Sequence, residues 1–136
     1  VLRAANKPAG TLDLHTDLRS AKVQELRAMP FAALHVWDTS AHLQVRLEAR
    51  VEILTGQDVA MIWAGVPEAS RLAYGTSPAP GQPIADALAY TKGPDPAFFA
   101  VLRVNVSSID ALHLGPNHRR ARFDRLDGWT GVWLTP

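Results

Sequence analysis

Cysteine is absent from the 136 residues, which excludes disulfide frameworks, thiol catalysis and thiolate metal sites. A chain without cysteine fits the cytoplasm, which is the location we expect. Excess charge is also lacking, because 14 Lys and Arg residues are balanced by 13 Asp and Glu residues, a formal net charge of +1. This balance predicts no general affinity for nucleic acid. No apolar run approaches the roughly 18 residues that cross a bilayer, so we expect no membrane partner.

Recognisable catalytic and metal-binding motifs are missing as well. The five histidines show no HExxH or comparable ligand spacing, so no metal site is predicted. Neither a GxSxG element nor a Gly-rich phosphate loop occurs, and the sequence identifies no catalytic residue.

The composition that is present is typical of a globular domain, with 47% hydrophobic and 20% charged residues. A chain of this length buries a core without a metal or disulfide, so we expect one domain over residues 1–136. Because the sequence begins at Val1, in an apolar stretch and without Met, we expect the natural N-terminus to lie upstream.

Periodicity predicts about seven strands and two or three short helices. Residues 1–6 and 11–16 flank a turn-forming Asn-Lys-Pro-Ala-Gly segment, which indicates a hairpin. A helical period then follows Asp17, the expected N-cap, and ends at Pro30, which cannot continue a helix. The clearest strand covers residues 42–54, where apolar odd positions alternate with polar even positions.

Further strands are expected at 31–37, 98–106, 109–114, 120–125 and 129–134, and helices at 57–65 and 68–74. Residues 75–97 contain five prolines and three glycines and are expected to form a loop that covers a site or joins another subunit. The pattern favours a mainly β protein, a closed antiparallel barrel with helices packed on it.

The segment HTDLRSAKVQEL, residues 15–26, contains donors that suit an anion. A helix starting within it presents free backbone N–H groups at its N-terminus, which attract phosphate. Arg19 and Lys22 would share a helix face, and Thr16 and Ser20 add hydroxyl donors. For this segment alone, an ordinary helix cap followed by solvated cations is the favoured interpretation.

Two other polar features have both a structural and a functional interpretation. Gln44 lies on the long strand, where it either faces solvent or binds the edge of a heteroaromatic ring. His118, Arg120 and Arg122 follow one another along one face of a strand. They form an anion site, a nucleic-acid patch or a solvated surface.

Together these segments resemble the pyridoxamine 5′-phosphate oxidase family of FMN-binding split barrels, in particular its "oxidase-related" flavoproteins. The likeness covers nearly the whole chain, with VLR, HTDLRSAKVQEL, LQVRLEARVEIL, PEASRLAYGTSPAPGQPI, RRARF and WTGVWLTP in family order. The resemblance implies an antiparallel split β-barrel and a homodimer that binds FMN at the subunit interface.

Carried over by position, the resemblance assigns FMN contacts to nine residues: Arg3, His15, Thr16, Arg19, Ser20, Lys22, Gln44, Gln82 and Arg122. Arg19 would supply the phosphate charge, since Ala21 stands where the oxidase has an arginine. His118 and Arg120 fall where the oxidase binds its substrate, but with the residue types exchanged. Oxidation of pyridoxamine 5′-phosphate is therefore not expected.

Three functions follow from this sequence. The favoured one is an FMN-dependent oxidoreductase that acts on an unidentified small molecule, in which the flavin carries the chemistry and the protein orients it. The second is a flavin-binding or flavin-sequestering module without turnover. The most remote is a barrel-type nucleic-acid binder that uses residues 118–125.

Overall fold

The computed structural model describes residues 2–136, so Val1, the first residue of the first predicted strand, lies outside the described part. These residues divide into two compact units. Unit 1 comprises residues 2–30 and 52–103, and unit 2 comprises residues 31–51 and 104–136. None of the helices in the described part is long and apolar enough to cross a membrane.

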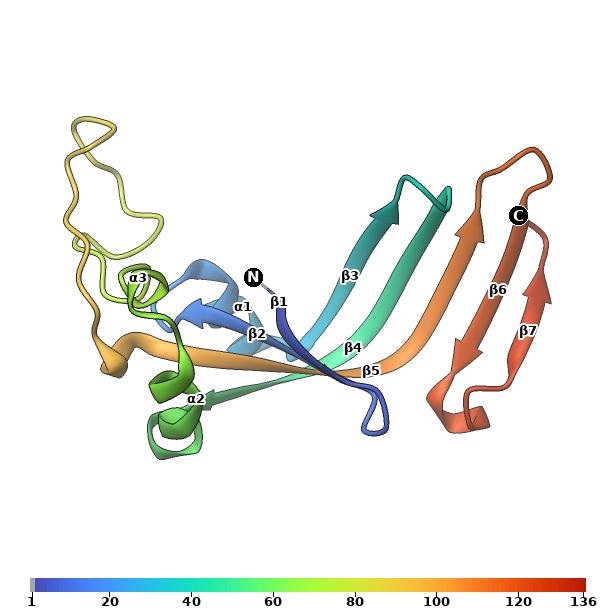
Figure 1. Cartoon of the computed structure of the whole chain (residues 1–136), viewed down its shortest axis with the longest axis horizontal. Coiled ribbons are helices and arrows are strands. Elements are labelled where there is room, and N and C mark those ends of the chain that lie inside the picture. Colours follow the sequence, from blue (N-terminus) through green and yellow to red (C-terminus); the bar gives the residue numbers. More distant parts are fainter. Residues whose placement is uncertain (1) are drawn as a thin grey trace. The chain divides into compact units, whose positions relative to one another are not determined.

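Figure 1 shows the strands, which are β1 (Leu2–Asn6), β2 (Thr11–Asp17), β3 (Phe31–Asp38), β4 (Leu43–Thr55), β5 (Phe99–His113), β6 (Arg119–Asp124) and β7 (Gly131–Leu134). The helices are α1 (Ala21–Ala28), α2 (Ala60–Gly65) and α3 (Glu68–Arg71), with 3₁₀ turns η1 (Gly56–Val59), η2 (Pro96–Phe98) and η3 (Arg125–Asp127). The hydrogen-bonded strand order is β1-β2-β5-β4-β3, and β6 pairs with both β5 and β7.

The sheet is antiparallel and open, so the expectation of a closed barrel was wrong. Closure requires every strand to have two neighbours. Among the described residues, β1, β3 and β7 each have only one. The 15-residue strand β5 instead has three neighbours, because a strand of this length offers room for successive partners along one edge.

Unit 1 begins with the predicted hairpin, in which β1 and β2 pair antiparallel with Asn6 opposite Thr11. The predicted helix begins later than expected, with Ser20 and not Asp17 as its N-cap. The reason is a long-range hydrogen bond, since the backbone N–H of Leu18 donates to the carbonyl O of Phe98 at 2.7 Å. This bond holds Leu18 outside the helix, so the helix begins only after Ser20. The helix stops before Pro30, as predicted.

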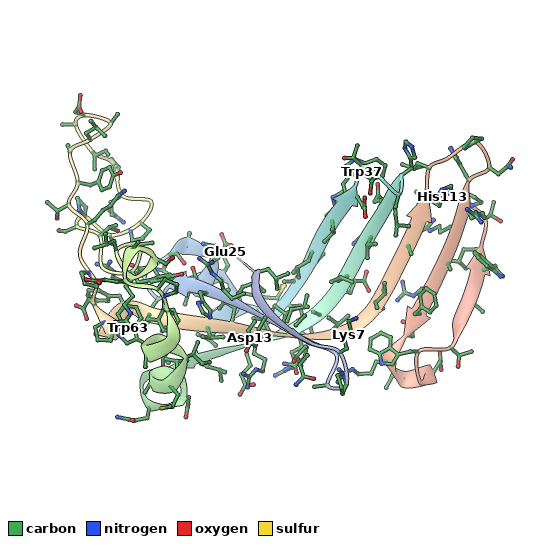
Figure 2. The ribbon with its side chains drawn as sticks, viewed as in Figure 1. Lys7, Asp13, Glu25, Trp37, Trp63 and His113 are labelled. Atoms are coloured by element: carbon green, nitrogen blue, oxygen red, sulfur yellow. The ribbon has the colours of Figure 1, made fainter. Side chains whose placement is uncertain are left out.

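The core of unit 1 is built around Phe99, the first residue of β5, which is fully buried. Its ring centroid lies 5.0 Å from those of His15 and Tyr74 and 5.1 Å from that of Trp63. Trp63 lies on α2, as Figure 2 shows, and the valines Val59 and Val66 complete the cluster. The helix predicted at 57–65 is therefore confirmed in position, and its Trp63 packs on Phe99 at the start of β5. The helix predicted at 68–74 is shorter and ends at Arg71.

The proline-rich segment 75–97 is a loop, as predicted, up to the short 3₁₀ turn η2 (Figure 1, yellow). Its base is closed by two backbone hydrogen bonds between Ser77 and Thr91, at 3.0 and 2.8 Å. The backbone N–H of Asp95 also donates to the carbonyl O of Tyr74 at 2.8 Å. Gly75 has a φ of +133°, and a side chain there would collide with the carbonyl O of Gly93. Glycine is therefore required where the loop begins.

Unit 2 contains β3, β6, β7 and the adjoining parts of β4 and β5. The alternation predicted for β4 is confirmed, because Ala49 and Val51 are buried whereas Arg46 and Arg50 are exposed. β3 pairs with β4 over its whole length, from Phe31 opposite Arg50 to Asp38 opposite Leu43.

β5 is one continuous strand, whereas two strands at 98–106 and 109–114 were expected. The polar pair Ser107 and Ser108 lies between the two expected strands. In the structure, the Ser107 hydroxyl donates to the carbonyl O of Glu48 at 2.9 Å, and the Ser108 hydroxyl donates to Glu48 Oε2 at 3.1 Å. Both serines are thus satisfied by β4, and the strand continues through them.

Candidate functional site

A cavity of about 420 Å³ in unit 1, here called the first cavity, brings together five of the predicted FMN-binding residues. These are Arg3, His15, Thr16, Ser20 and Lys22. Its remaining lining is Asp17, Ser70, Ala73, Tyr74 and Pro80. The hairpin, the start of α1 and the segment after α3 therefore contribute to one hollow, whose volume is within the usual range for small-molecule sites.

Three donors converge in the first cavity. The Thr16 and Ser20 hydroxyl oxygens lie 3.3 Å apart, and Lys22 Nζ lies 3.5 Å from Thr16 Oγ1. Both hydroxyl residues are buried, at 8% and 5% exposure. Ser20 is the N-cap of α1, yet its side chain makes no capping bond because it is turned toward Thr16. Two hydroxyls and an ammonium at this spacing suit an anion with several oxygens, such as a phosphate.

Arg19 does not line either cavity of unit 1 described here. Its guanidinium binds the Asp17 carboxylate at 2.8 Å and donates to the carbonyl O of Thr76 at 2.9 Å. Burial by itself would raise the pKa of Asp17, but hydrogen bonds from the Arg19 side chain and backbone bring the pKa below its ordinary value. The charge of Arg19 is thus offset by Asp17, and its contact with phosphate stays a prediction.

His15 is held against the unit 1 core, with its ring edge-on to Phe99. Burial lowers the pKa of His15, and the charge of Arg3 lowers it further. The imidazole is therefore neutral at pH 7, and it can present one donor and one acceptor.

A second cavity of about 380 Å³ shares Arg3 and His15 with the first. Its other lining residues are Ala4 and Asp13 of the hairpin, and Met61, Ile62, Gly65, Val66 and Pro67 of α2 and the segment that follows it. Asp13 is bound by two donors of Arg103, each at 3.0 Å. Apolar side chains thus form one wall, and polar groups of the hairpin form the other.

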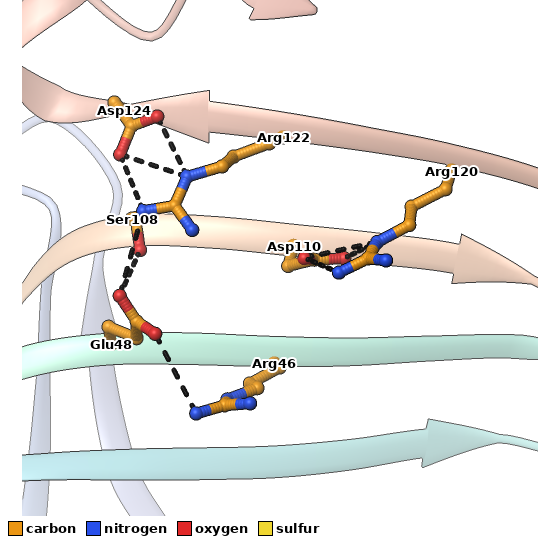
Figure 3. Close-up of polar contacts among 7 residues, drawn as sticks. All are labelled: Arg46, Glu48, Ser108, Asp110, Arg120, Arg122 and Asp124. Carbon is orange, nitrogen blue, oxygen red and sulfur yellow. Dashed lines mark hydrogen bonds and ion pairs between the residues drawn. The ribbon is translucent and has the colours of Figure 1, made fainter. Parts of the chain in front are cut away.

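In unit 2, arginines and carboxylates alternate on one face of β4, β5 and β6 (Figure 3). Arg120 Nη2 lies 2.7 Å from Asp110 Oδ2, and Arg122 Nε lies 3.0 Å from Asp124 Oδ2. Arg122 also lies 3.6 Å from Glu48. The hydrogen bond from Arg120 lowers the pKa of Asp110. Most of the positive charge of this strand is therefore balanced locally.

No group of three or more potential ligands is placed to hold a metal ion within the described residues. No family model matches the sequence. Among curated proteins, the chain is 27% identical over 134 residues to pyridoxine/pyridoxamine 5′-phosphate oxidase 2 of Arabidopsis thaliana. The aligned region covers 88% of this chain and 67% of that protein.

Among solved structures, the chain matches a pyridoxamine 5′-phosphate oxidase-related, FMN-binding protein of Nostoc punctiforme PCC 73102 with a TM-score of 0.83 and 25% identity. The match covers 100% of this chain and 78% of that one. The chain is similar in sequence and in fold to the pyridoxamine 5′-phosphate oxidase-like family of FMN-binding proteins. Its fold is accordingly the antiparallel split barrel of that family.

A further member of the same fold is PhzG of Burkholderia lata 383, whose structure contains tetrahydrophenazine-1-carboxylic acid. It has a TM-score of 0.75 and 17% identity, over 99% of this chain and 72% of that one. This likeness concerns the fold alone.

The other residues assigned from the oxidase-like family lie outside both cavities. Gln44 is half-buried on β4 opposite Trp37 in unit 2, which also contains Arg122. Gln82 is exposed in the loop of unit 1, where its backbone N–H donates to Ala79 at 3.2 Å. His118 is exposed just before β6. FMN contacts of Gln44, Gln82 and Arg122, and a substrate contact of His118, stay predictions.

Five lining residues of the first cavity were not assigned to the site from the sequence: Asp17, Ser70, Ala73, Tyr74 and Pro80. Ser70 belongs to the PEASRLAYG segment that resembles the oxidase-like family, so that likeness was an available signal. Tyr74 lies in the same segment, but its own pattern is that of a core aromatic, and it is only 6% exposed. Its place beside the cavity follows from its packing on Phe99, at 5.0 Å between ring centroids.

Proposed function

We propose that this chain binds FMN with the flavin phosphate in the first cavity, and that it serves as an FMN-dependent oxidoreductase for a small-molecule substrate. The observation that supports this most directly is the convergence of Thr16, Ser20 and Lys22. A phosphate group accepts hydrogen bonds through several oxygens, so two buried hydroxyls and one ammonium fit it well.

When bound, FMN supplies hydride or electron transfer, and the protein supplies binding and orientation. Thr16, Ser20 and Lys22 would hold the phosphate. Arg3 and the neutral His15 line the same cavity and would contact the remainder of the cofactor. The family likeness alone supports the FMN contacts proposed for Gln44, Gln82 and Arg122.

A homodimer is part of the proposal because unit 2 exposes apolar side chains on strands that have a single neighbour among residues 2–136. On β3, Phe31, Val36 and Trp37 are 61%, 52% and 45% exposed; on β7, Val132, Trp133 and Leu134 are 57%, 77% and 39% exposed. Strands of this kind pair or pack with another chain unless they are protected. A second copy of this chain is the partner that the family likeness supports.

Pyridoxamine 5′-phosphate is not the substrate that we propose. The positions corresponding to the oxidase's substrate-binding arginine and histidine carry His118 and Arg120, with the types exchanged. Arg120 is moreover bound to Asp110 through both Nε and Nη2. A nucleic-acid patch on β6 is disfavoured, since the charges of Arg120 and Arg122 are balanced by carboxylates.

The phosphate site is tested by titrating the protein with FMN and with riboflavin, following flavin fluorescence. Lys22→Ala should weaken FMN binding by about tenfold or more and leave riboflavin binding nearly unchanged, because riboflavin lacks the phosphate. Lys7→Ala, in the exposed turn of the hairpin (Figure 2), is the matched control and should change neither affinity. A protein that binds no FMN, or equal losses for both flavins in Lys22→Ala, would contradict the proposal.

A further inference from the structure

The second cavity has an apolar wall that is held in place by the core of unit 1. Ile62 packs against the buried cluster to which Val66 belongs, so this part of the wall has a fixed position. Met61 stands at the rim and is 85% exposed. Its flexible thioether side chain adapts to ligands of different outline. Such a wall fits the apolar body of a small molecule.

The polar wall of the second cavity carries one unbalanced charge. The carboxylate of Asp13 is held by Arg103 through two bonds of 3.0 Å, so these two charges offset each other. His15 is neutral at pH 7, because its pKa is lowered by burial and by Arg3. Among the ion pairs of the described residues, none involves Arg3. A single guanidinium is therefore available to a ligand.

We propose that the second cavity is a substrate subsite for compact, mainly apolar molecules that carry one carboxylate, and that it discriminates against phosphate esters. A guanidinium matches a carboxylate through two parallel N–H···O bonds. A phosphate monoester carries between one and a half and two negative charges at about pH 7. It would need a second cation, and Lys22 lines the first cavity but not the second.

The inference rests on the proposed function only in calling this ligand a substrate. The selectivity belongs to the residues of the second cavity. Because the donors of the first cavity also suit phenyl phosphate, the selectivity is measured with FMN added and, without FMN, in the Lys22→Ala variant. Benzoate, benzamide and phenyl phosphate are suitable probes, because they share an apolar ring and differ in charge. Isothermal titration of the protein with each probe gives the three affinities directly.

Benzoate should bind about tenfold more tightly than benzamide and than phenyl phosphate. Arg3→Gln should remove the advantage of benzoate over benzamide, whereas the exposed control Lys7→Gln should keep it. Met61→Lys adds a second cation at the rim without disturbing the core. This variant should raise the affinity for phenyl phosphate severalfold relative to that for benzamide.

Three results would overturn the inference: no benzoate binding at millimolar concentration, phenyl phosphate binding as tightly as benzoate, or an unchanged benzoate preference in Arg3→Gln. Each is separate from a failure of the proposed function. A protein that selects benzoate but binds no FMN keeps the carboxylate site and loses the flavin proposal. A protein that binds FMN but does not bind benzoate keeps the flavin proposal and loses the carboxylate site.

Discussion

Arg19 binds the Asp17 carboxylate through two donors, Nε to Oδ1 at 3.0 Å and Nη2 to Oδ2 at 2.8 Å. The same Nη2 donates to the carbonyl O of Thr76, and the guanidinium lies 3.7 Å from the ring centroid of Phe98. One side chain thus joins the end of β2 to the base of the proline-rich loop and to η2. We infer that Arg19 positions the turn that carries the donors of the first cavity.

Arg19→Ala should lower the free energy of unfolding by about 2–4 kcal/mol, because it leaves a buried carboxylate without its cation. The Asp17 side chain is only 4% exposed, so water compensates little. Urea unfolding measures the loss. The double variant Asp17→Asn with Arg19→Ala should recover part of it, while Arg27→Ala on the exposed side of α1 should change stability by less than about 0.5 kcal/mol.

Flavin binding separates this positioning role from the phosphate contact that the family likeness assigns to Arg19. A positioning role predicts that Arg19→Ala weakens FMN and riboflavin by similar factors and reduces stability. A direct phosphate contact predicts a selective loss of FMN affinity with little change in the unfolding midpoint. The two titrations, made on the same variant, give opposite patterns for the two roles.

His15 should make stability depend on pH. Its folded-state pKa lies below the ordinary value of 6.5, so below that pH the unfolded chain binds the proton more readily than the folded chain. The free energy of unfolding should therefore fall as the pH decreases from 6.5 toward the lowered pKa, and this contribution then levels off. Denaturant titrations at stepped pH check this.

The matched variants for this pH dependence are His15→Gln and His35→Gln. The first should show a smaller decline below pH 6.5 than the wild type. The second removes an exposed histidine of β3 and should show the wild-type decline. If His15→Gln declined as steeply as the wild type, another group would be responsible.

Trp133→Ser should shift the proposed homodimer toward monomer, with a dissociation constant raised by about tenfold or more. Trp133 is 77% exposed on β7, which has one strand neighbour in the described structure. Leu126→Ser is the control, because Leu126 is 98% exposed but lies on η3, outside the strands. Sedimentation equilibrium measures both, and equal dissociation of the two variants would rule out the β7 face as the interface.

The parts of the fold that were predictable are those decided by neighbours in sequence. The alternation in β4 reports directly which residues face the interior, and Pro30 stops α1 through its own ring. The continuity of β5 and the start of α1 depend on bonds from Ser108 to Glu48 and from Leu18 to Phe98. These partners are remote in the chain, and no local pattern contains them.

The candidate site, like the fold, has one part that was predictable from neighbours in sequence and another that depends on remote contacts. Thr16, Ser20 and Lys22 occupy one short segment, so their residue types already suggested an anion site, and the structure brings them together. The orientation of the Arg19 side chain depends on its hydrogen bonds to the Asp17 carboxylate and to the carbonyl O of Thr76, and the sequence alone does not predict these bonds. Nor could the apolar wall of the second cavity be predicted, since it requires α2 to be packed on β5.

The closed base of the proline-rich loop has a consequence for the evolution of this protein. Because Ser77 and Thr91 are joined by backbone hydrogen bonds, residues between them can be inserted or deleted at a cost of only about 0.6 kcal/mol for each doubling of loop length. Pro80, in that interval, lines the first cavity. Changes within this loop can therefore reshape the rim of the cavity without altering Thr16, Ser20 and Lys22, which belong to another segment of the chain.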